Sequence, residues 1–358
     1  MAMKPGNLSQ TVWRRSVGKQ FHDQKRDGVS DLTREGRYSS LAMPAGGYAV
    51  WADSVKEGSS GRIGYYAVLE AAGNVAAAGA VPSAISAQIQ LPPGSEEETL
   101  RELAAGIRTA CDEMNLAASC IQGEVSHGVC RNTVLATAAG SAESMTEDRI
   151  YPGQEILLCG CTGLEGTLRI LDEAGDELRT RFVPAFLAEA EAMNRELVLP
   201  QALAKALELK RSDGEGTDRR CVTAVRQIGS GGILAALWDL AEHAQIGLES
   251  DLGLMTLRQE TVEICEFFHL NPYQMTSAGS FLLAADHAEE VIAVLKEAGA
   301  RAGRLGVARA QNARVITSGE ETRYLDRPAP DELIRWWEER LSGLQFTPNR
   351  RPHAHSPR

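Results

Sequence analysis

A cluster of small residues precedes a long apolar segment in the second half of the chain. The segment ILAALWDLAEHA has the pattern of a helix, and the four residues directly before it are Gly229, Ser230, Gly231 and Gly232. Glycine costs backbone entropy, so such a cluster indicates tight or positive-φ geometry, or close approach by another group. The first turn of a helix has unpaired N–H groups and partial positive charge. The stretch therefore predicts an anion-binding turn, most often for phosphate, or else a plain glycine turn with Ser230 near the N-cap.

The seven cysteines form no motif typical of metal or redox sites. No CxxC pair occurs, and the nearest spacing is Cys159-Gly-Cys161. In a strand these two side chains would share one face, and we interpret them as small buried hydrophobic residues. An odd number of cysteines without a secretory signal indicates a reducing compartment, so we expect a cytoplasmic protein.

The composition is that of an ordinary globular protein large enough for two domains. The chain has 358 residues, of which 43% are hydrophobic and 24% charged. The net charge of −11 argues against nucleic acid as a partner, because phosphate backbones require a basic surface. No apolar run approaches the roughly 20 residues of a membrane span. A small phosphorylated ligand, held by local N–H groups, is compatible with this charge.

Strands and helices are predicted in both halves without strict βαβ alternation, which favours an α+β fold. The first half predicts strands over 47–55, 83–91, 117–125 and 131–140, and helices over 61–78 and 95–114. Ser95 and Glu98 predict a capping box for the second helix. The second half predicts strands over 155–160, 221–227, 246–251, 279–286 and 303–317, and helices over 163–178, 182–194, 198–209, 231–244, 258–268 and 286–299.

A charged link containing Pro152 and Gly153 marks a domain boundary near 148–153. We divide the chain into an N-terminal extension (1–35), an N-terminal domain (36–150), a C-terminal domain (151–328), and a C-terminal helix with a disordered tail (329–358). The two histidines of that tail are interpreted as solvated side chains.

Two long segments resemble one known family. Residues 73–98, GNVAAAGAVPSAISAQIQLPPGSEEE, resemble the N-domain motif of the AIR synthase-related superfamily. Residues 228–300, beginning IGSGGILAALWDLAEHAQ, resemble the C-domain of its hydrogenase maturation factor branch. The resemblance spans roughly residues 10–328. It implies two α+β domains, with ATP bound between the N-domains of a homodimer and reaching the glycine turn.

The resemblance also implies site residues in the N-domain. Asp53, in WADSV, matches the acid of the family's Thr-Asp position, and Glu124, in IQGEVSHG, matches that of its Gly-Gly-Asp/Glu-Thr region. Both are therefore candidate ligands of magnesium and of the nucleotide. Asn74 stands where the family has a carboxylate, so an amide supplies a dipole without charge. Asn74 is nevertheless a candidate contact of the nucleotide or its phosphate. The alternatives are a strand-end cap or solvated carboxylate for Asp53 and for Glu124, and a helix-packed amide for Asn74.

Other departures bear on the chemistry. Tyr38, Ser39 and Ser40 stand in the region of a further acidic motif of the family. The family's C-terminal cysteine is also missing, because the last cysteine is Cys265, within a predicted helix. Phosphoryl transfer depends mostly on positioning and metal electrostatics, so the lost acids weigh against it.

Two functions remain open. In the first, the protein binds ATP or another phosphorylated ligand between its two domains and uses ATP to activate an oxygen or a thio- or carboxamide group. In the second, it is a dimeric, non-catalytic relative that acts as a ligand-binding or assembly partner. Strands such as 84–89 alternate apolar and polar residues, and in the family they complete a shared barrel across a two-fold axis. We therefore expect a homodimer, whose partner is a small phosphorylated ligand or another protein.

Overall fold

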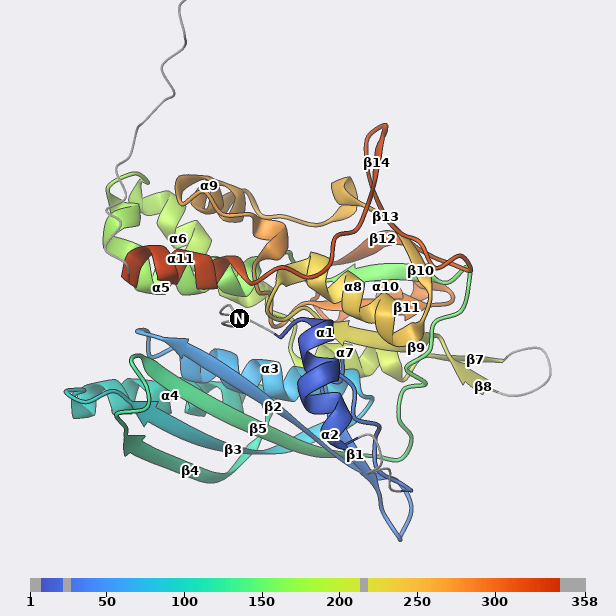
Figure 1. Ribbon diagram of the computed structural model, residues 1–358, viewed down its shortest axis with the longest axis horizontal. Coiled ribbons are helices and arrows are strands. Elements are labelled where there is room, and N and C mark those ends of the chain that lie inside the picture. The colour runs from blue at the N-terminus through green and yellow to red at the C-terminus, as the bar shows by residue number, and fades with distance from the viewer. Residues whose placement is uncertain (1–7, 22–26, 213–217, 342–358) are drawn as a thin grey trace, which may run out of the picture.

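The computed structural model describes residues 8–21, 27–212 and 218–341, which form two α+β domains, as the sequence predicts (Figure 1). The N-domain is a five-stranded sheet in the order β1-β2-β5-β3-β4. Its strands are β1 (Ser39–Ala42), β2 (Tyr48–Gly58), β3 (Val81–Leu91), β4 (Ala117–Val125) and β5 (Asn132–Ala142). Helices α3 (Ile63–Ala77) and α4 (Glu97–Met114) cover one face of this sheet.

The two N-domain helices differ in burial because they occupy different layers. Helix α4 has one apolar stripe, including Leu103 and Ile107, and a charged outer face. Helix α3 is buried almost all round, because it lies between the N-domain sheet and the C-domain. Its small residues permit this close packing. A side chain at Gly73, for example, would collide with Gln227 of the other domain.

The C-domain contains a seven-stranded sheet in the order β14-β13-β10-β12-β6-β11-β9. Its strands are β6 (Glu155–Cys159), β9 (Val222–Gln227), β10 (Gly247–Asp251), β11 (Phe281–Ala285), β12 (Ala302–Arg309), β13 (Arg314–Ser318) and β14 (Glu321–Tyr324). A separate hairpin joins β7 (Lys210–Ser212) and β8 (Asp218–Arg220). Helices α7 (Pro200–Leu207) and α10 (Ala288–Glu297) pack on one face of the large sheet, and α8 (Gly232–Ala244) packs on the other.

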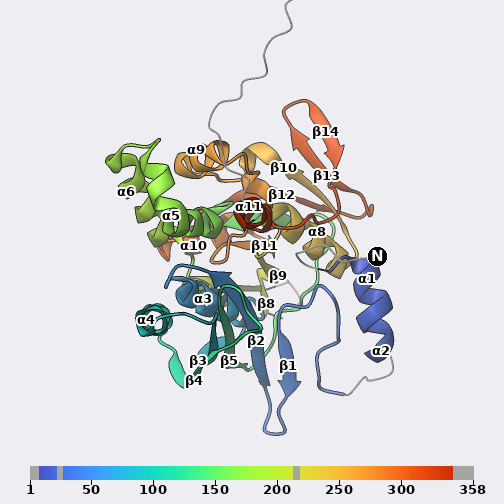
Figure 2. The same cartoon turned by 60° about the vertical axis from the view of Figure 1, so that its left-hand side comes forward.

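The remaining α-helices form two groups. Four of them gather at one side of the C-domain (Figure 1): α5 (Leu164–Arg179), α6 (Pro184–Ala192), α9 (Gln259–Phe267) and α11 (Glu332–Leu341). Near the N-terminus, α1 (Gln10–Trp13), the π-helical turn Arg14–Gly18 and α2 (Lys19–Phe21) form one short helical segment. Figure 2 shows α1 beside α8, where the Gln10 amide donates to Glu242.

Most predicted elements occur within a few residues of their expected bounds. The predicted strand 303–317 is instead two strands, β12 and β13, separated by a turn. The predicted capping box is wrong: Glu96 occupies the N-cap of α4, and the Ser95 hydroxyl donates to the Pro92 carbonyl. Within the described residues, no helix is long and apolar enough to cross a bilayer. The predicted disordered tail lies mostly in 342–358, outside the described residues.

Candidate functional site

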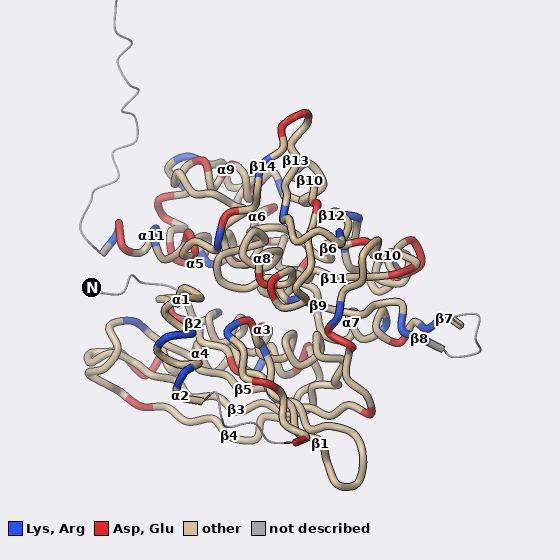
Figure 3. The backbone as a smooth tube through the Cα atoms, turned by 45° about the vertical axis from the view of Figure 1, so that its right-hand side comes forward, with Lys and Arg blue, Asp and Glu red and all other residues tan. Residues whose placement is uncertain are grey.

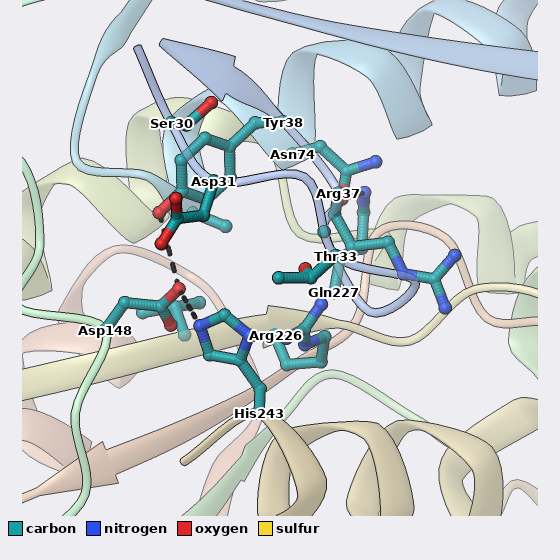
Figure 4. A pocket seen from close by; sticks show the side chains of 13 residues that line it. Ser30, Asp31, Thr33, Arg37, Tyr38, Asn74, Asp148, Arg226, Gln227 and His243 are labelled. Atoms are coloured by element: carbon teal, nitrogen blue, oxygen red, sulfur yellow. Dashed lines mark hydrogen bonds and ion pairs between the residues drawn. The ribbon is translucent and has the colours of Figure 1, made fainter. Parts of the chain in front are cut away.

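A cavity with a volume of about 250 Å³ lies between the two domains. Figure 4 shows its side chains converging from the segment before β1, from α3, from the domain link and from the C-domain. The cavity is lined by Ser30, Asp31, Thr33, Gly36, Arg37, Tyr38, Asn74, Ala77, Asp148, Val225, Arg226, Gln227 and His243. Of the residues that sequence reasoning singled out for binding, Asn74 alone lines it.

Arg226 is the most unusual group in this cavity. It lies at the end of β9 and is only 5% exposed. One guanidinium nitrogen donates to the Glu35 carbonyl, while Nε is buried without a hydrogen-bond partner. Burial, followed by the nearby charge of Arg37, lowers the pKa of Arg226. A buried guanidinium with an unused donor is costly unless an anion satisfies it.

Two carboxylates, Asp148 and Asp239, carry charges that act on Arg226, and both are in direct contact with other side chains. Asp148 lies 2.9 Å from Nε2 of His243, and the Tyr38 hydroxyl donates to Asp148 over 3.4 Å (Figure 4). Although burial raises the pKa of Asp148, the hydrogen bond and charge of His243 outweigh it, so the pKa is lowered. Burial and the Asp148 charge raise the pKa of the Tyr38 hydroxyl, which therefore stays a neutral donor.

The second carboxylate, Asp239 on α8, forms ion pairs with Arg34 and with Arg37, and Arg37 lines the cavity. It is buried and accepts from Arg34 over 3.0 Å and from Arg37 over 2.9 Å. These contacts fix Arg37 beside the cavity while leaving its guanidinium partly exposed. Arg37 and Arg226 thus place two guanidinium groups at one cavity.

An amide pair joins the two domains at the base of the cavity. Gln227 donates to the Asn74 side-chain oxygen over 3.0 Å and to the Glu70 carbonyl over 2.8 Å. Its own oxygen accepts from the Gly279 N–H. Gly73 leaves the space that the Gln227 amide fills. The expected site residue Asn74 therefore lines the cavity, with its oxygen used in a contact between domains.

The glycine turn has the backbone that the sequence predicts, at the other end of α8. Gly231 and Gly232 have φ angles of +89° and +69°, in the region that favours glycine. The Gly231 N–H donates to Oδ2 of Asp331 over 2.7 Å. The anion at this helix terminus is therefore a carboxylate of the chain itself. Phosphate binding by Gly229, Ser230, Gly231 and Gly232 stays a prediction.

Asp53 and Glu124 lie on the N-domain sheet, away from the glycine turn. Their face is opposite to α3, because the neighbouring Ser54 is the residue that bonds to α3. Asp53 accepts from Thr137 over 2.5 Å, and Glu124 accepts from Gln90 over 3.3 Å. Three strand spacings and four residues separate the two acids, or about 20 Å.

One metal ion therefore cannot contact both acids of a single chain. A shared site would need acids from two chains, and metal binding by Asp53 and Glu124 stays a prediction. Within one chain the two acids do not share a cleft with the glycine turn, because they lie on the sheet face opposite to α3.

Sequence reasoning missed Arg37, Asp148, Arg226 and His243. The one available signal was Arg226, the single charged residue in the strand sequence CVTAVRQ. Arg37, Asp148 and His243 come from segments that are far apart in the chain, and no local sequence pattern predicts that they lie at one cavity.

Both domains match models of one protein family. The family model "AIR synthase related protein, N-terminal domain" matches residues 42–142, and the corresponding C-terminal domain model matches residues 152–318. A carbamoyl dehydratase HypE of Rhodobacter capsulatus is 25% identical over 321 residues, covering 83% of this chain and 86% of the relative.

Two solved structures share the fold. A hydrogenase maturation protein HypE in complex with ATP superposes with a TM-score of 0.65 and 20% identity, covering 92% of this chain and 98% of that one. The structure of a HypE–HypF complex gives a TM-score of 0.67 and 17% identity, covering 87% and 100%.

Proposed function

Because the chain belongs to the AIR synthase related protein family, we propose that it binds ATP or another phosphorylated ligand in the cavity between its two domains. The observation that carries this proposal is Arg226. Its guanidinium is buried, its Nε donor is unused, and no described carboxylate forms an ion pair with it. A phosphate oxygen would supply the missing charge and acceptor.

The surrounding groups support an anion of this kind. The charges of Asp148 and Asp239 act on Arg226 from nearby, but their direct contacts are with His243 and with Arg34 and Arg37, so neither pairs directly with the Arg226 guanidinium. Arginine suits phosphate because its planar guanidinium can donate two parallel hydrogen bonds. The ATP complex of a HypE with the same fold makes ATP the first ligand to try.

The cavity volume limits how much of the ligand it holds. At about 250 Å³ it lies just below the roughly 300–1,000 Å³ of typical ligand pockets. It therefore suits the phosphorylated end of a ligand better than a complete nucleoside triphosphate, whose remainder would extend out of the cavity.

Calorimetric titration with ATP, inorganic phosphate and adenosine tests the proposal. We expect ATP to bind and adenosine to bind at least about tenfold more weakly, because charge-assisted hydrogen bonds contribute about 1.5–3 kcal/mol each. Inorganic phosphate should compete with ATP. Equal affinity for adenosine and ATP would contradict recognition of the phosphate.

A second candidate function is ATP-driven activation of an oxygen or a thio- or carboxamide group, or assembly with a partner protein. The carbamoyl dehydratase name of one relative and the HypE–HypF complex favour it. Against the dehydratase chemistry, Cys265 is buried in α9, and the raised pKa of its thiol, caused mainly by burial, makes it a poor nucleophile. Release of phosphate from ATP by the purified protein would support the catalytic candidate.

The glycine turn is a further proposed phosphate contact. A phosphate there would have to displace Asp331 from Gly231. Gly231→Ala adds a methyl group 2.8 Å from the Ala235 side chain at a positive φ, which should lower the free energy of unfolding by about 1–3 kcal/mol. A loss of ATP affinity greater than that of Asp331→Asn would support ligand contact at the turn, and unchanged affinity would leave it a structural turn.

A further inference from the structure

We infer that the phosphorylated ligand binds without a divalent cation, and that Arg226 and Arg37 supply the positive charge that magnesium would otherwise provide. This inference rests on the proposed function, because it specifies how the cavity recognises the ligand. The resemblance to the family implies magnesium held by Asp53 and Glu124.

Magnesium requires anionic oxygen ligands in a compact octahedral arrangement. Asp53 and Glu124 are about 20 Å apart on the sheet face opposite to α3. Among the described residues, no group of three or more His, Cys, Asp or Glu side chains is arranged to hold a metal ion. The two acids expected to bind magnesium therefore do not form its site within one chain.

The cavity itself offers a poor ligand set for the ion. Asn74 is an amide, and its oxygen already accepts from Gln227 over 3.0 Å. The Asp148 carboxylate, one of two that line the cavity, is held by His243 and Tyr38. Both contacts are made to Oδ2, so Asp148 would offer a metal ion only its other oxygen, close to the positive charge of Arg226.

The same cavity is lined by two guanidinium groups, which lie there together with the carboxylates of Asp31 and Asp148. Arg226 is buried with an unused donor, and Arg37 is held in place by Asp239. Guanidinium groups neutralise phosphate oxygens directly and need no bridging ion. A magnesium ion close to Arg226 would add repulsion to a guanidinium whose pKa is already lowered by burial and by Arg37.

Calorimetric titration of ATP into the full chain, in EDTA and in excess MgCl₂, tests the inference. We expect the Kd in EDTA to be equal to or lower than that in Mg²⁺, because free ATP carries more negative charge than its magnesium complex. Binding that weakens more than about tenfold in EDTA would overturn metal-independent recognition while leaving the proposed function intact. No binding in either buffer would overturn the proposed function, and this inference with it.

A charge change at the family's acid position gives a second readout. In EDTA, Asn74→Asp should weaken ATP binding about tenfold, since a carboxylate beside the phosphate repels it, and Mg²⁺ should recover part of the loss. The matched control Asn312→Asp adds the same charge on an exposed turn and should leave the Kd unchanged. Tighter binding by Asn74→Asp in EDTA would contradict the inference.

Discussion

At the scale of single residues, Asp331 combines a structural role with an unfavourable charge. One of its oxygens accepts from the Leu333 N–H, at the start of α11, and the other accepts from Gly231. Burial raises its pKa from 3.8 to about 6, although these two hydrogen bonds lower it, and the neighbouring charge of Glu165 raises it further. Asp331 thus contributes two contacts while its ionisation opposes the folded state.

This raised pKa predicts a pH dependence of stability. Because the pKa is higher in the folded state, the stabilisation is complete below pH 4 and is lost as the pH rises through 6, by about 3 kcal/mol in total. Urea unfolding at pH 4.5 and 7.5 should show about 2 kcal/mol of this loss in the wild type and none of it in Asp331→Asn. Asp326→Asn, an exposed change in the same segment, is the control. The same pH dependence in Asp331→Asn would assign it to another group.

The residues of the cavity were less predictable than those of the turn. Glycine adopts positive φ angles without steric cost, so the local sequence was enough to predict such angles at Gly231 and Gly232. The anion opposite Gly231 could not be foreseen, because Asp331 lies 100 residues further along the chain. For Arg226 the sequence shows a charged residue within a strand, but it does not reveal that the guanidinium will be buried without an ion pair.

At the scale of elements, α11 joins the two domains. It lies beyond residues 152–318, which match the C-terminal family model. Trp337 on this helix contacts Arg131 of the N-domain and Arg169 of α5 through its ring, with guanidinium carbons 4.5 and 4.9 Å from the ring centre. Its indole N–H donates to Glu173 over 3.2 Å. The helix therefore stabilises the arrangement of the domains that encloses the cavity.

Truncation of this side chain should be costly. Trp337→Ala removes a nearly buried indole and both guanidinium contacts, and we expect it to lower the free energy of unfolding by about 3–5 kcal/mol. Glu338→Ala changes an exposed neighbour on the same helix and should have an effect below about 0.5 kcal/mol. Denaturant unfolding monitored by circular dichroism measures both. Equal effects would show that α11 does not stabilise the domain junction.

The bounds of the helices and strands were predicted from the sequence more accurately than the contacts of single residues. The apolar period of α8 predicted 231–244 against the observed Gly232–Ala244. Two predictions about these elements were wrong, the capping box of α4 and the single strand over 303–317. Ser95 bonds to the carbonyl of Pro92 instead of capping α4. The turn between β12 and β13 was hidden because the residues on both sides of it are compatible with strand.

At the scale of the whole molecule, the N-domain sheet has an uncovered face. Val55 and Leu135 are cross-strand partners on this face, and they are 59% and 36% exposed. Figure 3 shows charged residues of both signs distributed over the helices and loops of both domains, with longer uncharged stretches along the N-domain strands. A partly apolar face of this kind indicates association with another surface.

We predict that this face forms the interface of a homodimer. Light scattering at micromolar concentration should give twice the mass of one chain. Leu135→Asp should shift the protein to a monomer, because it buries a charge at the two-fold contact. Val183→Asp, at an exposed apolar residue of the C-domain, should leave the dimer intact. A monomeric wild type would contradict the prediction.

Binding of a ligand's phosphate by Arg226 between the domains can be measured by ATP titration of the wild type, Arg226→Gln and the control Arg304→Gln. Arg304 is a half-exposed arginine on β12. We predict that Arg226→Gln weakens ATP binding about 10- to 100-fold without lowering the thermal unfolding temperature, because it removes a buried charge that has no ion pair. Arg304→Gln should bind ATP like the wild type. Wild-type affinity in a folded Arg226→Gln variant would contradict the account.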